Sequence, residues 1–133
     1  MTQKSVIVSL DGERRFNVLN PSGGSFVLDP GHPDRFLSPM EALLGALGAC
    51  TGYDVVSIME KKKQPLASYR IEVNGDRAAG HPMRYEKIIL THIGSGPDVK
   101  LAALERAVYL SHEKYCSVAS SLNCTIETRV LVE

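Results

Sequence analysis

The chain has 133 residues, enough for one domain with a real core and too few for two domains of typical size. Its 15 Lys and Arg residues balance its 15 Asp and Glu residues, and no basic cluster is dense enough to indicate nucleic-acid binding. Trp is absent and aromatic residues make up only 6%, which argues against a stacking platform for single-stranded nucleic acid.

The cysteine count and the N-terminal segment together predict a cytoplasmic protein. Three cysteines are an odd number, which fits a reducing compartment better than a secreted disulfide framework. The first ten residues hold no sustained apolar core, so we expect no signal peptide. We therefore expect a single domain, residues 1–133, that does not insert into a membrane.

The first part of the chain predicts three short strands followed by a loop. Ser5–Leu10 alternates with the period of a strand, and Arg15–Leu19 returns after Asp11-Gly12, a typical hairpin turn. A third strand is predicted at Ser25–Leu28. Asp29–Leu37 is rich in proline and glycine and is expected to be a loop.

Ser38–Lys63 predicts one long helix. Ser38 suits the N-cap, Pro39 the first helical position and Glu41 the third, so the start reads as a capping box. Between residues 42 and 59 the only strongly polar side chain is Asp54, and a helix apolar on all faces is normally surrounded by protein or lipid. Because glycines, a threonine and Asp54 interrupt the apolar run, we expect a buried central helix rather than a membrane span.

The second half predicts two strands, two helices and a last strand. Tyr69–Val73 is expected to pair with Tyr85–Ile93 across a long loop, with a turn at residues 94–97. Asp98 is expected to cap a helix that ends near residues 112–115 and whose apolar face is Leu101, Leu104, Val108 and Tyr115. A short helix at Cys116–Leu122 and a strand at Cys124–Val132 complete the chain.

This order of elements predicts an α+β fold with a mainly antiparallel sheet, because the strands come as hairpins rather than in strand–helix–strand alternation. A helix apolar on all faces needs more cover than so short a chain supplies. We therefore expect a homodimer.

Cys50 and Cys116 are the candidates for chemistry. A thiol reacts as its thiolate, and Cys116 near a helix start would gain acidity from the positive end of that helix. Cys50, in mid-helix, gains nothing from its own helix, and Asp54 one turn on would oppose its ionisation if it faced the same way. Cysteine is also a common core residue, and Cys124, which alternates with Ile126, is assigned no role.

Other site classes find little support in the sequence. There is no Cys-x-x-Cys, and the only close Cys/His pair is His112 and Cys116, so no metal site is predicted. No Gly-x-Ser-x-Gly motif indicates a hydrolase, and the glycine pairs do not match nucleotide-binding signatures. We expect no cofactor.

Two stretches of the chain carry a resemblance to a known family. They are Ser38–Ile58, which holds SPME, LGALGAC and DVVSI, and Leu110–Val118, which reads LSHEKYCSV. Together they resemble the OsmC/Ohr family, and within it the YhfA-type branch of OsmC-like proteins. The expected order of elements also agrees, so the resemblance covers essentially the whole chain. It implies an OsmC-like fold and an intertwined homodimer with active sites at the subunit interface.

The resemblance also implies a thiol-dependent peroxidase that reduces organic hydroperoxides in oxidative or osmotic stress defence. The family's peroxide-attacking cysteine, which becomes a sulfenic acid, corresponds to Cys50. The second cysteine, which condenses with it to a disulfide, corresponds to Cys116. A lipoyl or thioredoxin-like dithiol would then reduce the pair. The acidity expected from a helix start favours Cys116, whereas the family places the nucleophile at Cys50.

The activating residues of the family match less closely. In the Ohr branch a Glu directly follows the proline and acts together with an Arg, whereas Met40 holds that place here. Glu41 lies nine residues before Cys50, about half a turn away around the helix, and fits the capping box better. Arg14 and Arg15, beside the first hairpin turn, are the candidate activating cations, with Glu41 as the candidate carboxylate.

Two other functions compete with the peroxidase. A non-catalytic dimer that senses redox state or binds a small hydrophobic ligand is the alternative, and Met40 in place of the Ohr-branch Glu favours it. A structural dimer whose cysteines serve only as core residues is the third.

Overall fold

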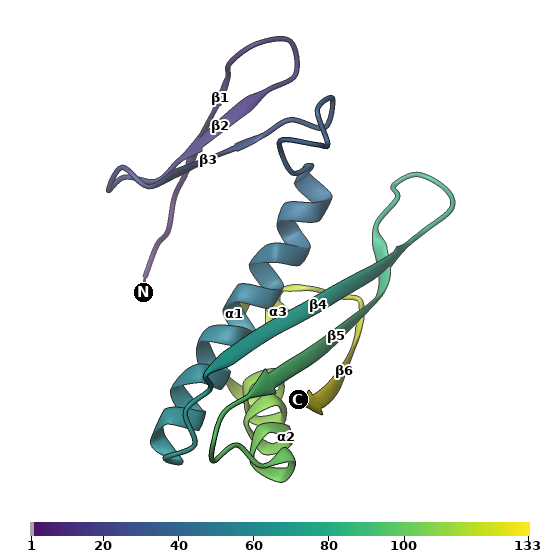
Figure 1. Ribbon diagram of the computed structural model, residues 1–133. Helices are drawn as coiled ribbons and strands as arrows, with labels where there is room; N and C mark the ends of the chain where they lie inside the picture. Colours follow the sequence, from purple (N-terminus) through teal and green to yellow (C-terminus); the bar gives the residue numbers. More distant parts are fainter. Residues whose placement is uncertain (1) are drawn as a thin grey trace. The chain divides into compact units, whose positions relative to one another are not determined.

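The computed structural model describes residues 2–133 of the chain and contains three helices, a π-helical turn and six strands within that range (Figure 1). The chain forms two compact units, residues up to Leu43 and residues 44–133, which are described in turn. The α+β class predicted from the sequence is confirmed.

The first unit contains an antiparallel sheet in the order β1-β2-β3, made of β1 (Ile7–Leu10), β2 (Phe16–Leu19) and β3 (Ser25–Leu28). The first two strands begin slightly later than predicted. In the predicted hairpin the Asp11 N–H donates to the Arg15 carbonyl at 2.7 Å, and Gly12 takes a left-handed φ of 116°.

The sheet of the first unit has little core of its own. Among its described residues only Val18 and Asp29 are buried, whereas Ile7 is 68% and Leu10 62% exposed. Strands this apolar normally pack against another surface.

The long helix α1 (Pro39–Lys61) begins as the sequence predicted. The Ser38 N–H donates to Glu41 Oε1 at 2.9 Å and the Glu41 N–H donates to Ser38 Oγ at 3.2 Å, so the capping box is confirmed. The helix ends two residues before the predicted Lys63, which has a φ of 59°.

One face of α1 is buried within the chain, formed by Leu47, Gly48, Thr51, Val55 and Met59. Gly45, Ala49 and Tyr53 on other faces are exposed. By length and composition α1 could cross a membrane, a property that core helices of water-soluble proteins share.

The second unit holds a mixed sheet in the order β4-β5-β6, formed by β4 (Ser68–Arg77), β5 (Tyr85–Ser95) and β6 (Thr125–Val132) (Figure 1). β4 and β5 are antiparallel, whereas β5 and β6 are parallel. The pairing is thus mainly antiparallel, as predicted, with one parallel pair, because the helical segment between β5 and β6 returns the chain to the same end of the sheet.

Both strands of this hairpin run further than predicted. β4 continues through Asn74-Gly75, and a Cβ on Gly75 would lie 2.6 Å from the Tyr85 ring. This glycine therefore serves the close approach of a ring rather than a turn. β5 likewise includes Gly94, where a Cβ would lie 2.8 Å from the Leu66 side chain, so the predicted turn starts too early.

The helical segment that follows was only partly predicted. α2 (Leu101–Leu110) has Lys100 rather than Asp98 at its N-cap, and the Lys100 N–H donates to Gln64 Oε1 at 3.0 Å. Its buried residues are Leu104, Ala107 and Val108, whereas the predicted face members Leu101 and Tyr115 are exposed. The chain then forms a π-helical turn, η1 (Ser111–Tyr115), and the short helix α3 (Ser117–Ser121).

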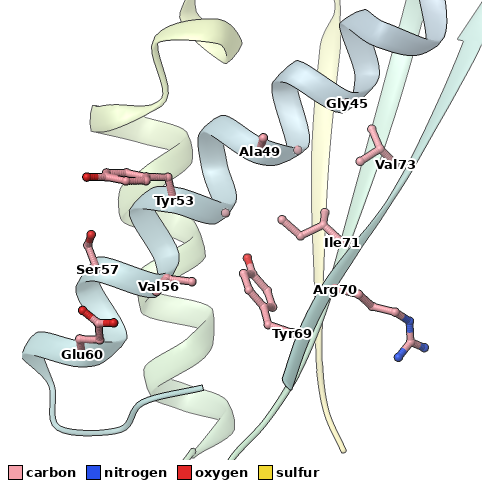
Figure 2. A pocket seen from close by; sticks show the side chains of 12 residues that line it. Gly45, Ala49, Tyr53, Val56, Ser57, Glu60, Tyr69, Arg70, Ile71 and Val73 are labelled. Atoms are coloured by element: carbon pink, nitrogen blue, oxygen red, sulfur yellow. The ribbon is translucent and has the colours of Figure 1, made fainter. Parts of the chain in front are cut away.

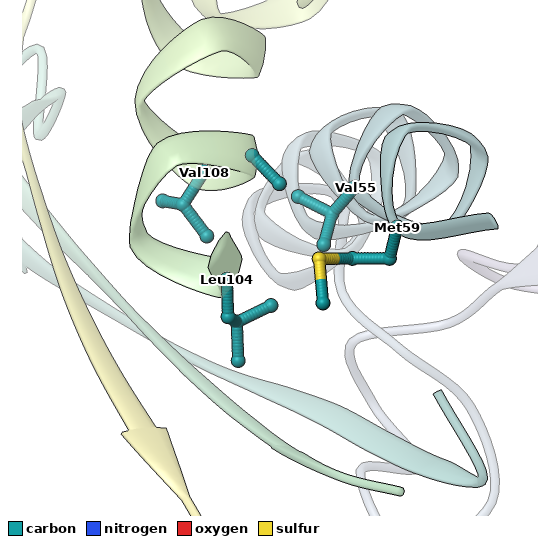
Figure 3. Packing of buried hydrophobic residues seen from close by; sticks show 5 residues of the cluster. Val55, Met59, Leu104 and Val108 are labelled. Carbon is teal, nitrogen blue, oxygen red and sulfur yellow. The ribbon is translucent and has the colours of Figure 1, made fainter. Parts of the chain in front are cut away.

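The core of the second unit lies where α1 meets α2. Val55 and Met59 of α1 point toward Leu104 and Val108 of α2 (Figure 3), with Ala107 completing the buried cluster. β6 packs against the cluster through Val130. This contact fixes α2, and with it the segment that carries Cys116, against the helix that carries Cys50.

Leu104→Ala tests the core. Leu104 is fully buried, so the substitution should lower the free energy of unfolding by about 2–5 kcal/mol. Leu101→Ala in the same helix removes the same atoms from an exposed position and should change it by no more than about 0.5 kcal/mol. Urea unfolding at one fixed protein concentration measures both, and equal losses would contradict the packing described.

Candidate active site

The structure brings Cys50 and Cys116 together. Cys50 lies on α1 and is partly buried, whereas Cys116 is buried and forms the N-cap of α3. The two thiols are neighbours, close enough for Cys50 to act on the pKa of Cys116, and neither is in a disulfide. Cys124 is also a free thiol and lies just before β6.

The environment of Cys116 makes it a weak acid. The pKa of the Cys116 thiol is raised to about 11; burial is the largest cause, and the neighbouring Cys50 also acts to raise it. The Ala119 N–H, which donates to Cys116 Sγ at 3.4 Å, and the Val118 N–H act in the opposite direction. The helix-end effect predicted from the sequence is therefore present, but it is too weak to make Cys116 acidic, because α3 is only five residues long and the thiol is removed from water.

A buried polar network lies beside the thiol pair. Ser111 Oγ donates to Asp54 Oδ2 at 2.8 Å and lies 2.9 Å from Thr51 Oγ1. The Asp54 carboxylate thus accepts a hydrogen bond from Ser111. The position of Asp54 one turn after Cys50 did not predict this contact. Sequence reasoning missed Ser111 and Thr51 as site residues, and the only signal was the place of Ser111 in the LSHEKYC stretch.

The predicted activating residues belong to the first unit, and the structure shows their local contacts. Arg15 Nε donates to Asp29 Oδ2 at 3.1 Å, and the same oxygen lies 2.8 Å from His32 Nδ1. Burial would raise the pKa of Asp29, but hydrogen bonds from His32, Arg15 and a backbone N–H lower it. Arg14 is exposed and Glu41 is held in the capping box. Arg14, Arg15 and Glu41 stay predictions as activating residues.

His92 is buried in β5 and forms a structural pair with Tyr69. Its Nδ1 lies 2.6 Å from the Tyr69 hydroxyl, and the two rings stack with centroids 5.9 Å apart. Burial lowers the pKa of His92 to about 4, so the imidazole is neutral at physiological pH. Within residues 2–133 no group of three or more His, Cys, Asp and Glu side chains could hold a metal ion.

A groove of about 720 Å³ lies on a different face of α1, between that helix and β4. Gly45, Ala49 and Val56 form the helix side, and Tyr69 and Ile71 point into it from β4, while Arg70 points away from the helix (Figure 2). Cys50 does not line this groove. The apolar groove and the thiol pair are therefore separate features of α1.

Residues 31–130 match the family described as OsmC-like protein. The chain belongs to the OsmC-like family. It is 42% identical over 101 residues to the protein YhfA of Escherichia coli K12, an alignment that covers 76% of this chain and 75% of that protein. The identification of an OsmC-like, YhfA-related chain from its two cysteine motifs is confirmed.

Solved structures of other proteins share the fold. A hypothetical protein from Aquifex aeolicus superposes with a TM-score of 0.90 at 34% identity, covering 100% of this chain and 98% of the other. An organic hydroperoxide resistance protein from Elizabethkingia anophelis superposes with a TM-score of 0.70 at 12% identity, covering 100% and 96%. At that identity the second comparison establishes a shared fold and no more.

The high pKa of Cys116 can be measured directly. In a Cys50→Ser/Cys124→Ser variant, thiolate absorbance at 240 nm should stay absent below about pH 9, because burial disfavours the charged form. In urea the same thiol should titrate near the usual value of about 8.5. A variant with all three cysteines replaced by serine supplies the tyrosine background, and a midpoint below pH 8 in the folded protein would contradict the description.

Proposed function

We propose that this protein is a thiol-dependent peroxidase that reduces organic hydroperoxides through Cys50 and Cys116 in the cytoplasm. The observation that carries the proposal is the pair of neighbouring free thiols, one on α1 and one at the start of α3. Membership of the OsmC-like family and the shared fold with an organic hydroperoxide resistance protein support it.

The environments of the two thiols support different roles for them. Cys116 is protonated at neutral pH because burial raises its pKa to about 11, which makes it a poor first nucleophile. Cys50 is therefore assigned the attack. Its thiolate attacks the terminal peroxide oxygen, the O–O bond breaks, the alkoxide leaves and takes up a proton from solvent as the alcohol, and Cys50 becomes a sulfenic acid.

Cys116 then resolves the sulfenic acid. Its sulfur attacks the Cys50 sulfur, the S–O bond breaks, and hydroxide leaves and takes up the Cys116 proton as water. Since the thiols already lie side by side, the attack needs little rearrangement. A dithiol reductant of the lipoyl or thioredoxin-like class then returns both thiols by two exchange reactions.

We also propose that the working form is a homodimer. The strands of the first unit are largely exposed, and the helix side of the α1 groove is formed mainly by small residues. A second copy of the chain would supply apolar surface for both, because small side chains allow another backbone to approach closely. A closed dimer would also cover the free strand edges.

The peroxidase assignment is tested by titrating the reduced protein with cumene hydroperoxide and, separately, with hydrogen peroxide. Wild type should lose two thiols and about two hydrogens in mass within seconds, faster with the organic peroxide. Cys50→Ser should abolish the reaction, and Cys116→Ser should allow one turnover and then over-oxidise at Cys50. Cys124→Ser is the matched control and should behave as wild type. Equal rates in wild type and Cys50→Ser would refute the peroxidase.

Gly45→Glu tests the dimer. A Cβ at this helical position meets no atom within 4 Å, so the change should not harm the fold of the chain, and glutamate favours a helix over glycine by about 0.5–1 kcal/mol. A second copy seated in the groove would meet a buried charge. Light scattering should give about twice 14.5 kDa for wild type and a smaller mass for the variant.

Gly80→Glu is the control for this experiment, since a Cβ there also meets nothing within 4 Å and Gly80 lies in a loop. Its mass should equal that of wild type. A monomeric wild type, or a Gly45→Glu variant that stays dimeric at micromolar concentration, would count against the proposed interface.

A redox sensor without turnover is the second candidate function. The observation that favours it is the engagement of Glu41 in the capping box, next to Met40 where the Ohr branch has its glutamate. A sensor would form the Cys50–Cys116 disulfide reversibly, and its reaction with peroxides would be slow. The same titration separates the two functions, because a sensor would lose thiols over minutes with either oxidant.

A further inference from the structure

We propose that Ser111 is a positioning residue that holds Cys116 against Cys50, acting with Thr51 and Asp54 as a polar latch between α1 and the π-helical turn. This inference rests on the proposed thiol chemistry and extends it to the residues that set the geometry of disulfide formation. It is carried by the contacts of Ser111, which is fully buried at the first position of η1.

The side chain of Ser111 is tied to α1 immediately after Cys50. Its hydroxyl donates its single proton to Asp54 Oδ2 at 2.8 Å, the shorter of two contacts, since the Thr51 carbonyl oxygen lies 3.5 Å away. The contact of 2.9 Å with Thr51 Oγ1 must then use the Thr51 proton. Thr51 directly follows Cys50, and Asp54 lies one turn further on. Both hydrogen bonds of Ser111 are therefore made to the turn of α1 that carries the Cys50 thiol.

The main chain of Ser111 is tied to Cys116. Its carbonyl accepts the Cys116 N–H at 2.8 Å, across the five-residue spacing that defines the π-turn. On its other side Cys116 Sγ accepts the Ala119 N–H at 3.4 Å. Ser111 therefore contacts the Cys50 helix through its side chain and the Cys116 backbone through its carbonyl. A π-turn in a helix is frequently found at functional sites.

The latch should affect the formation of the Cys50–Cys116 disulfide and not the initial attack of Cys50 on an oxidant. Attack on an external oxidant depends on Cys50 alone, whereas disulfide formation depends on how often the Cys116 sulfur is in line with Cys50. A displacement of about 1 Å can slow an intramolecular step about 100-fold. Loss of the Ser111 hydroxyl should therefore act on the intramolecular step.

Ellman's reagent separates the two steps without any peroxide. In a Cys124→Ser background the Cys50 thiolate attacks the reagent's disulfide, releases one thionitrobenzoate and forms a mixed disulfide at a rate proportional to reagent concentration. Cys116 then attacks the Cys50 sulfur, releases a second thionitrobenzoate, and its proton goes to solvent. This second phase is independent of reagent concentration. Stopped-flow absorbance at 412 nm resolves both.

Ser111→Ala should leave the first phase within about twofold of wild type and slow the second about 10- to 100-fold, with the mixed disulfide visible by mass. Ser111→Thr, which restores a hydroxyl, should recover part of the second rate. Ser121→Ala, which removes an exposed hydroxyl that bonds only within α3, should change neither phase. Leu104→Ala weakens the same α1–α2 contact without touching the latch and controls for lost stability.

A wild-type second phase in Ser111→Ala, or one slowed no more than in Leu104→Ala, would overturn the positioning role. If Ser111→Ala does not fold, Asp54→Ala removes the oxygen that accepts the Ser111 hydroxyl, and an unchanged second phase there would overturn the positioning role equally. A second phase that Ser111→Ala slows, in a protein that does not react with peroxides, would refute the peroxidase function and support the positioning role of Ser111. Rapid peroxide reduction with a normal second phase in Ser111→Ala would support the peroxidase function and refute the positioning role.

Discussion

The contact between α1 and the segment running from α2 to α3 is the interaction on which the candidate site depends. Val55 and Met59 on one side and Leu104, Ala107 and Val108 on the other exclude water from this contact. Because the cysteines lie on different sides of it, neither would have a thiol neighbour if the helices separated. The hydrophobic contact supplies most of the attraction, and the Ser111 network beside it supplies direction, because hydrogen bonds are geometrically specific where apolar packing is not.

The same burial decides how the two thiols differ. An apolar environment disfavours a thiolate, and at Cys116 this effect exceeds the help of two backbone N–H groups at the start of α3. A thiol that stays protonated is unsuited to attack a peroxide first but is protected from direct oxidation. It can still form a disulfide once a sulfenic acid forms beside it. This behaviour agrees with the proposed roles, in which Cys50 attacks the peroxide and Cys116 resolves the sulfenic acid.

α1 also presents a second surface, the groove beside β4, for which we propose a different role. The groove beside β4 does not include Cys50, so the side of the helix that we assign to association is separate from the side that holds the thiols. A helix that is apolar on more than one face is normally surrounded by protein on each of them. One of these partners is the chain's own α2, and the proposed second partner is another copy of the chain.

Local features were readable from the sequence because their causes are local. The capping box at Ser38 and Glu41, the hairpin at Asp11-Gly12 and the helix start near Cys116 each depend on a few neighbouring residues, and the structure has them nearly where predicted. The two cysteine motifs were enough to identify the family. The residues that set the properties of the site were not readable in the same way.

Only the tertiary structure decided the acidity of Cys116, the partner of Asp54 and the role of Gly75. Each depends on a residue far away in the sequence: burial and Cys50 for the thiol, Ser111 for Asp54, and the Tyr85 ring for the glycine. The sequence by itself determined the helix, its cysteine and the order of elements, since hydrogen bonds within a turn and side-chain periodicity act over a few residues. The electrostatics of the thiol pair came from packing, because desolvation depends on everything that surrounds a group.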